Sequence, residues 1–160
     1  MRLIRVSVLA ALLSTLVSTN SFADITGFIG ANTTPGNRQT LGASIGMSLL
    51  IIGFEFEYAV TTDDPAAGAP SLKTGMANLL LQTPVPLAGF QPYVTAGGGI
   101  YNETLAAHSD TSFGTNLGGG VKVSLVGPLA LRVDYRVFNL GSGALYSPAH
   151  RIYAGLNLKF

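Results

Sequence analysis

Apolar and polar residues alternate along most of the chain after residue 23. The alternation is clearest over residues 41–49, 52–60, 113–125, 129–137 and 151–160. Successive side chains of a β-strand point to opposite faces, so a period of two gives one apolar face and one polar face. We therefore predict a strand at each of these five segments.

Three further segments, 24–32, 72–83 and 90–103, show a weaker form of the same pattern. The first is short and rich in glycine, the second contains three consecutive leucines, and the third contains three consecutive glycines. With the five clearer segments they make eight predicted strands. Each is close to the length of about 9–11 residues that a tilted strand needs to cross a bilayer.

The predicted connections alternate in length. Short ones lie near Leu50, at 84–89 and at 126–128, and the polar connections at the other end are 33–37, 61–71, 104–111 and 139–149. Outer-membrane barrels have short periplasmic turns and longer extracellular loops. We predict an all-β fold: an eight-stranded antiparallel up-and-down transmembrane β-barrel, with both termini on the periplasmic side.

The composition indicates which face of the strands meets lipid. The chain is 48% hydrophobic and 11% charged, whereas soluble domains average about 25% charged residues. A soluble barrel such as a lipocalin would bury the apolar face and expose the other face to water. That other face consists mostly of Gly, Ser, Asn and Ala. We therefore expect the apolar face to contact lipid and the polar face to line a narrow lumen.

Net charge and cysteine content exclude several classes of function. The formal net charge is +1, so no basic excess points to nucleic acid as a partner. The chain has no cysteine, which excludes a disulfide framework and a thiolate metal site.

The N-terminus has the organisation of a secretory signal peptide. Arg2 and Arg5 precede an apolar stretch at 6–17, and Ser21 and Ala23 frame a small-x-small cleavage site. We predict a signal peptide at 1–23, export through the general secretory pathway, and an outer-membrane barrel domain at 24–160. The alternative is an uncleaved anchor helix.

Charged residues on the polar face predict a network inside the barrel. Glu55 and Glu57 lie on the third predicted strand, and Arg132, Asp134 and Arg136 lie on the seventh. These strands face each other across a lumen that is only wide enough for its own side chains. Because buried charges are costly unless paired, we expect a Glu/Arg network that plugs the lumen. Further polar lumen residues are Asn116, Lys122, Arg151, Asn157 and Lys159.

Few residues suggest catalysis. His108, Ser109 and Asp110 fall in the predicted loop 104–111, and Ser147 and His150 lie near the start of the eighth strand. Adjacent loop residues do not supply the geometry of a Ser-His-Asp triad, in which each side chain must reach the next. We predict no catalytic residue, no metal site and no cofactor.

Three stretches carry a family resemblance: YAGLNLKF at the C-terminus, PYVTAGGGIY at 92–101 and FGTNLGGGVKVSL at 113–125. They resemble small outer-membrane β-barrels of the OmpA/OmpX and OmpW-like types. The resemblance implies the barrel architecture and an outer-membrane location, and it implies that Phe160 is the assembly signal. Unlike OmpA, this chain is expected to have no peptidoglycan-binding domain. The chain has no Trp. An aromatic girdle at the membrane–water interface would therefore consist of Phe and Tyr, and the candidates are Phe54, Tyr58, Phe90, Phe113, Tyr135 and Phe160.

The expected function is a structural or surface-interaction role in the outer membrane. The alternatives are a narrow channel for ions or small solutes, and an enzyme that modifies lipid A or phospholipid. The expected partners are outer-membrane lipids, lipopolysaccharide and the barrel assembly machinery. We expect a monomer.

Overall fold

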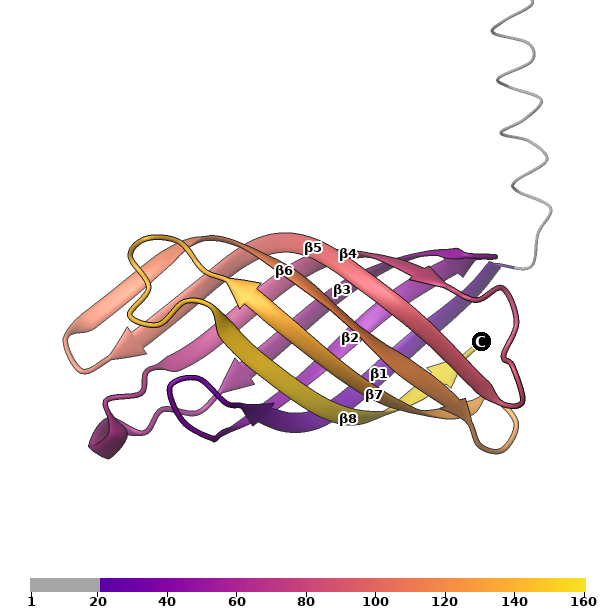
Figure 1. Ribbon diagram of the computed structural model, residues 1–160, viewed down its shortest axis with the longest axis horizontal. Coiled ribbons are helices and arrows are strands. Elements are labelled where there is room, and N and C mark those ends of the chain that lie inside the picture. Colours follow the sequence, from indigo (N-terminus) through magenta and orange to yellow (C-terminus); the bar gives the residue numbers. More distant parts are fainter. Residues whose placement is uncertain (1–20) are drawn as a thin grey trace, which may run out of the picture.

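The computed structural model describes residues 21–160, which form a closed antiparallel barrel of eight strands in chain order (Figure 1). A short 3-10 helix, η1 (Pro65–Ala67), lies between the third and fourth strands. The fold predicted from the alternation is confirmed. The strands are β1 (Ser21–Asn32), β2 (Arg38–Leu49), β3 (Ile52–Thr61), β4 (Ser71–Gln82), β5 (Phe90–Leu105), β6 (His108–Ser124), β7 (Leu129–Asn139) and β8 (Ala149–Lys159).

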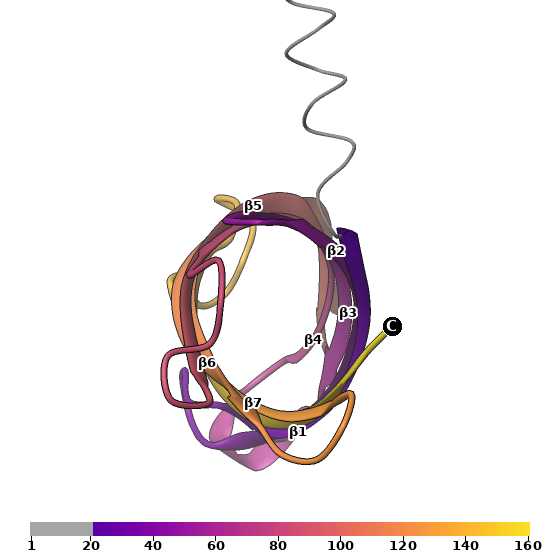
Figure 2. The ribbon, with the colours of Figure 1, turned by 90° about the vertical axis from the view of Figure 1, so that its right-hand side faces the viewer.

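The barrel is closed by pairing of β1 with β8, in a register that sets Ile25 opposite Leu158. Beyond the last strand residue, the Ala23 amide donates to the Phe160 carbonyl at 3.0 Å, and the Phe160 amide donates to the Ala23 carbonyl at 2.9 Å. The view along the axis shows the resulting ring (Figure 2). Each of the eight described strands therefore has two neighbours, so its backbone N–H and C=O groups find hydrogen-bond partners within the barrel, as lipid requires.

The two ends of the barrel differ. We call one the loop end, because the connections 33–37, 62–70 and 140–148 lie there, together with the tip of the β5–β6 hairpin. Ser21 and Phe160 lie at the other end, which we call the terminal end, with the turns 50–51, 83–89 and 125–128. Most of the predicted signal peptide falls outside the described residues, and β1 begins three residues before the predicted barrel domain.

The alternation sorts side chains between the outer wall and the lumen. On β3, Phe56 is 67% exposed on the outer wall, whereas its neighbour Glu55 is 3% exposed and points inward. The leucine run at 79–81 keeps this order, because Leu80 is buried while Leu79 and Leu81 are exposed. Within residues 21–160, no helix is long and apolar enough to cross a membrane.

The predicted polar loop 104–111 is wrong. β5 and β6 stay paired as far as Leu105 and His108, and only the two alanines between them form the turn. Cross-strand contacts carry the pairing past the expected strand ends: Asn102 Nδ2 donates to Thr111 Oγ1 at 2.8 Å. His108, Ser109 and Asp110 therefore lie on a strand and not in a loop.

Candidate functional site in the barrel lumen

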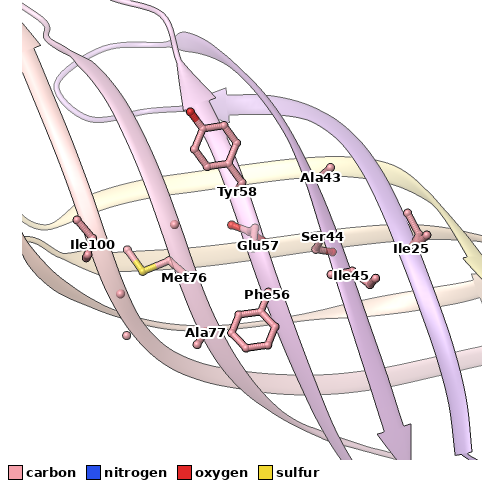
Figure 3. Close-up of a pocket in the computed structure, with 13 residues that line it drawn as sticks. Ile25, Ala43, Ser44, Ile45, Phe56, Glu57, Tyr58, Met76, Ala77 and Ile100 are labelled. Atoms are coloured by element: carbon pink, nitrogen blue, oxygen red, sulfur yellow. The ribbon is translucent and has the colours of Figure 1, made fainter.

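We consider two candidate sites in the described part of the chain. One is the lumen, in which charged, polar and aromatic side chains are buried. The other is a groove of about 710 Å³ on the outer wall over β1 to β5, where Phe56 and Tyr58 stand out from the strands (Figure 3). The residues predicted as a network lie in the lumen.

The centre of the lumen holds what we call the charged layer, where Arg132 on β7 reaches Glu55 on β3. Arg132 Nη1 forms an ion pair with Glu55 Oε2, and Arg136 Nη2 lies 2.9 Å from Glu55 Oε1. Asp134 lies between the two arginines, 3.1 Å from Arg132 Nη2 and 3.0 Å from Arg136 Nε. The structure thus brings together residues from opposite walls of the barrel. The members of the charged layer are Glu55, Glu57, Arg132, Asp134, Arg136 and Arg151.

Glu57 links Arg136 to Arg151 within the charged layer. Arg151 Nη1 donates to Glu57 Oε1 at 3.1 Å. Arg136 Nη1 lies 3.1 Å from Glu57 Oε2, an ion pair whose angle does not suit a hydrogen bond. Three carboxylates and three guanidinium groups make the layer neutral, which is the arrangement that buried charge requires.

Two tyrosines complete the charged layer. The Tyr93 hydroxyl donates to Asp134 and accepts from Arg132 Nε at 2.7 Å. The Tyr153 hydroxyl accepts from Arg136 Nη2 at 3.1 Å. The Arg132 guanidinium also lies over the Tyr93 ring, 4.9 Å from its centroid, in a cation–π arrangement. Sequence reasoning missed both hydroxyls. Tyr153 could have been found, because the alternation along β8 puts it on the same face as Arg151.

The other predicted lumen residues form pairs outside the charged layer. Toward the terminal end, Lys122 Nζ lies 2.7 Å from Asp24 Oδ2, joining β6 to β1 across the lumen. The remaining three are also paired: Asn157 Nδ2 with Thr26 Oγ1 at 2.8 Å, Lys159 Nζ with Gln91 Oε1 at 3.0 Å, and Asn116 Nδ2 with Asn78 Oδ1 at 2.8 Å.

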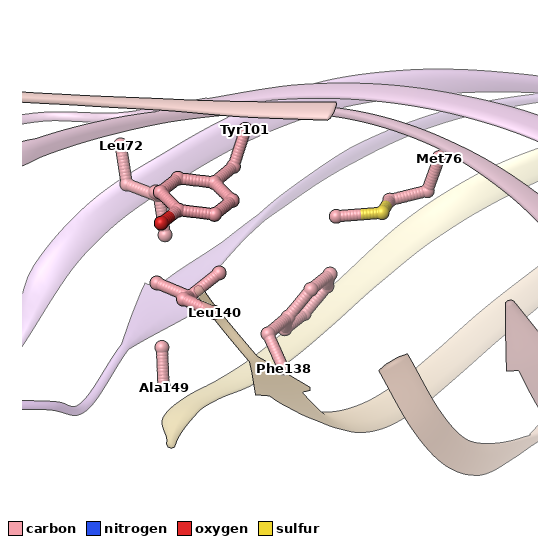
Figure 4. Packing of buried hydrophobic residues seen from close by; sticks show 6 residues of the cluster. All are labelled: Leu72, Met76, Tyr101, Phe138, Leu140 and Ala149. Atoms are coloured by element: carbon pink, nitrogen blue, oxygen red, sulfur yellow. The ribbon is translucent and has the colours of Figure 1, made fainter. Parts of the chain in front are cut away.

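The loop end of the lumen holds side chains of a different kind, an apolar cluster (Figure 4). Leu140 enters it from the loop 140–148, whose fold is held by the Leu140 amide donating to Ser147 Oγ at 3.0 Å and the Leu145 amide donating to Glu103 Oε2 at 2.7 Å. We call this cluster the apolar cap. Its members are Leu72, Met76, Tyr101, Phe138, Leu140 and Ala149.

Arg151 joins the charged layer to the apolar cap. Its guanidinium carbon lies 4.3 Å from the centroid of the Phe138 ring, while its Nη1 binds Glu57. Arg151 therefore connects the side chains at mid-height with those at the loop end. No apolar cap was predicted from the sequence.

Two of the residues considered for catalysis, Ser147 and His150, have other partners. Ser147 Oγ binds the backbone of Leu140, and His150 Nδ1 lies 2.6 Å from the Tyr135 hydroxyl. Across residues 21–160, no group of three or more His, Cys, Asp or Glu side chains could hold a metal ion.

Comparison with known proteins gives a family and several similar structures. The profile of the outer membrane protein beta-barrel domain matches residues 10–160. The N-terminal β-barrel domain of Pseudomonas aeruginosa OprF aligns with a TM-score of 0.66 and 18% identity, covering 89% of this chain and 98% of that one. Neisserial surface protein A aligns with a TM-score of 0.63 and 17% identity, covering 88% and 96%.

A third similar structure is the outer membrane enzyme PagL, with a TM-score of 0.51 and 12% identity, covering 86% of this chain and 98% of that one. At these identities, the likeness concerns the fold alone. No curated protein matches the chain.

Proposed function

The chain belongs to the outer membrane protein beta-barrel family, and we propose that it is a closed, non-conducting barrel with a structural and surface-interaction role in the outer membrane. Its lumen would be sealed by the charged layer and the apolar cap. Its contacts with the surroundings would come from the loop end and the lipid-facing wall.

The observation that carries the proposal is the position of Arg132. Its side chain is fully buried and reaches from β7 to Glu55 on β3, so side chains of opposite walls meet in the middle of the barrel. An ion that crossed this point would have to separate paired charges in a low-dielectric interior, at a cost of several kcal/mol. The apolar cap adds a second barrier at the loop end.

The alternative of a narrow channel uses the same side chains. A channel needs a continuous polar path, and the apolar cap interrupts that path between the charged layer and the loop end. A gated channel would therefore require the loop 140–148 to leave the lumen, taking Leu140 with it.

A lipid-modifying enzyme has less support. Ser147 and His150, which lie three residues apart at the loop end, are each bonded to another group. The likeness to PagL concerns the fold alone.

The proposal is tested by recording single-channel currents from the refolded barrel in a planar bilayer, after heat-modifiable gel migration has confirmed folding. We expect no reproducible steps from the wild-type chain. As a control, we use a variant with Glu55→Ala, Arg132→Ala and Phe138→Ala. It removes side-chain atoms from both the charged layer and the apolar cap, and it should produce current steps if it folds. Discrete wild-type steps that change size in Arg136→Gln would refute the proposal and establish the channel.

A further inference from the structure

One cation of the barrel faces outward. The described part of the chain contains seven basic residues, and six of them are buried or half-buried. The exposed one is Lys73 on β4. The others are Arg38, Lys122, Arg132, Arg136, Arg151 and Lys159.

Lys73 lies in a polar row near the loop end of the outer wall. It is opposite Asn102 of β5, and Asn102 is opposite Thr111 of β6. Asn102 Nδ2 donates to Thr111 Oγ1 at 2.8 Å. Outer-membrane barrels have their longer loops outside the cell, so the row lies where the outer leaflet carries its polar groups.

An apolar groove begins directly below Lys73. The next outward residues of β4 are Gly75 and Ala77, which line the groove. Tyr58 of β3 and Ile100 of β5 flank Gly75 and are 57% and 62% exposed. A Cβ built on Gly75 would meet only the Ile100 carbonyl, at 4.0 Å. The small residues of β4 thus form an open floor between taller side chains (Figure 3).

We propose that Lys73 and this groove bind one molecule of lipid A from the outer leaflet. The Lys73 ammonium takes a phosphate, Asn102 and Thr111 lie beside it as polar contacts, and an acyl chain lies over Gly75 and Ala77. The chemistry fits because an ammonium at the interface attracts anionic lipid headgroups, while hydrocarbon fills an apolar slot without leaving voids. The site does not depend on whether the lumen conducts.

A second copy of the chain is a poorer occupant of the groove. A two-fold interface places the same patch of both subunits face to face. The two Lys73 ammonium groups would then lie at the same height in the membrane, where their like charges repel each other. A phosphorylated lipid neutralises the same charge.

The test is native mass spectrometry of the refolded full barrel in detergent, titrated with diphosphoryl lipid A. Dioleoylphosphatidylglycerol serves as a second phosphate lipid and dioleoylphosphatidylcholine as a zwitterionic one. We compare Lys73→Gln, Lys73→Arg and Ala77→Leu with the wild type. Ala154→Leu is the matched control, because Ala154 is exposed on β8, far around the barrel from β4.

We expect one lipid A adduct to dominate in the wild type. Lys73→Gln should weaken its affinity about fivefold, which corresponds to one interfacial cation. Ala77→Leu should weaken binding by a similar factor, while Lys73→Arg and Ala154→Leu bind like the wild type. Equal affinities in all variants, or equal affinity for phosphatidylglycerol and lipid A, would overturn the proposal. Heat-modifiable migration of each variant shows that it is folded.

Discussion

Two regions of opposite chemistry occupy the lumen of this barrel. The charged layer at mid-height joins opposite walls through ion pairs such as Arg132–Glu55. The apolar cap at the loop end packs Leu140, which comes from a loop, against strand residues such as Phe138. The first region is built entirely from strands, whereas the second depends on the loop 140–148 staying folded into the barrel.

The two regions differ in how much free energy of unfolding is lost when one of their side chains is removed. An ion-pair network loses a large amount of free energy when one partner is removed, because the other charge stays buried and unpaired. An apolar cluster loses the contacts of the deleted atoms and part of the cavity cost. We therefore expect the charged layer to determine global stability and the apolar cap to control access from the loop end.

The largest effect is expected from Arg132→Met, which removes a cation from between Glu55 and Asp134. Because both carboxylates stay buried, the free energy of unfolding should fall by about 3–5 kcal/mol. Urea unfolding in lipid vesicles measures this loss. Arg38→Met is the matched control: Arg38 is a buried arginine at the loop end that donates only to the Thr34 carbonyl, and its loss should cost much less. Equal losses would show that the ion pairs of Arg132 add nothing to stability beyond the burial of an arginine side chain.

A smaller effect is expected from Leu140→Ala, which shortens the loop contribution to the apolar cap. Leu140 is 9% exposed, so the free energy of unfolding should fall by about 2 kcal/mol, the low end for a buried leucine. Leu145→Ala in the same loop is the control, because Leu145 is 43% exposed and should change stability by less than about 0.5 kcal/mol. If both variants behave alike, Leu140 is not packed as described.

The smallest effect concerns pH at the loop end. β5 has 16 residues, more than the about 9–11 that cross a bilayer, so Glu103 lies beyond the membrane-spanning part. Burial raises the pKa of Glu103 above its usual range. The folded barrel therefore keeps this proton to higher pH than the unfolded chain does, and stability falls as pH rises through the folded pKa.

Glu103→Gln tests this pH dependence, because the amide still accepts from the Leu145 amide but does not titrate. The stability of the wild type relative to Glu103→Gln, measured by urea unfolding, should decline as pH rises from the usual glutamate range toward neutral. A difference that is constant with pH, or that grows in favour of the wild type, contradicts the assignment.

Much of the barrel was predictable because the face on which a strand side chain lies follows from the alternation of its neighbours in sequence. The alternation over 52–60 determines that Glu55 and Glu57 share a face, and the strand count of a closed barrel sets β3 opposite β7. These two facts are enough to place Glu55 and Arg132 in one layer. The extension of β2 back to Arg38 was missed, because polar Arg38 and Thr40 on the inward face gave no apolar contrast.

The apolar cap and the groove were not predictable in the same way. Leu72, Met76 and Phe138 are apolar residues on the inward face, and a pattern that assigns apolar residues to lipid cannot identify them. The hydroxyl contacts of Tyr93 and Tyr153 depend on which side chains meet across the lumen, which parity alone does not specify. The two-alanine turn of the β5–β6 hairpin lacks the glycine that usually indicates such a turn.

A double-mutant cycle between Glu55 and Arg132 tests most directly whether the charged layer ties β3 to β7. The free energy of unfolding is measured in lipid vesicles for Glu55→Gln, Arg132→Met, the double variant and the wild type. We predict a coupling free energy of about 2–3 kcal/mol, as expected for contacting residues in one network. Losses that add to within about 0.5 kcal/mol would show that the two residues act independently, and the proposal of a lumen sealed by a cross-barrel network would then be wrong.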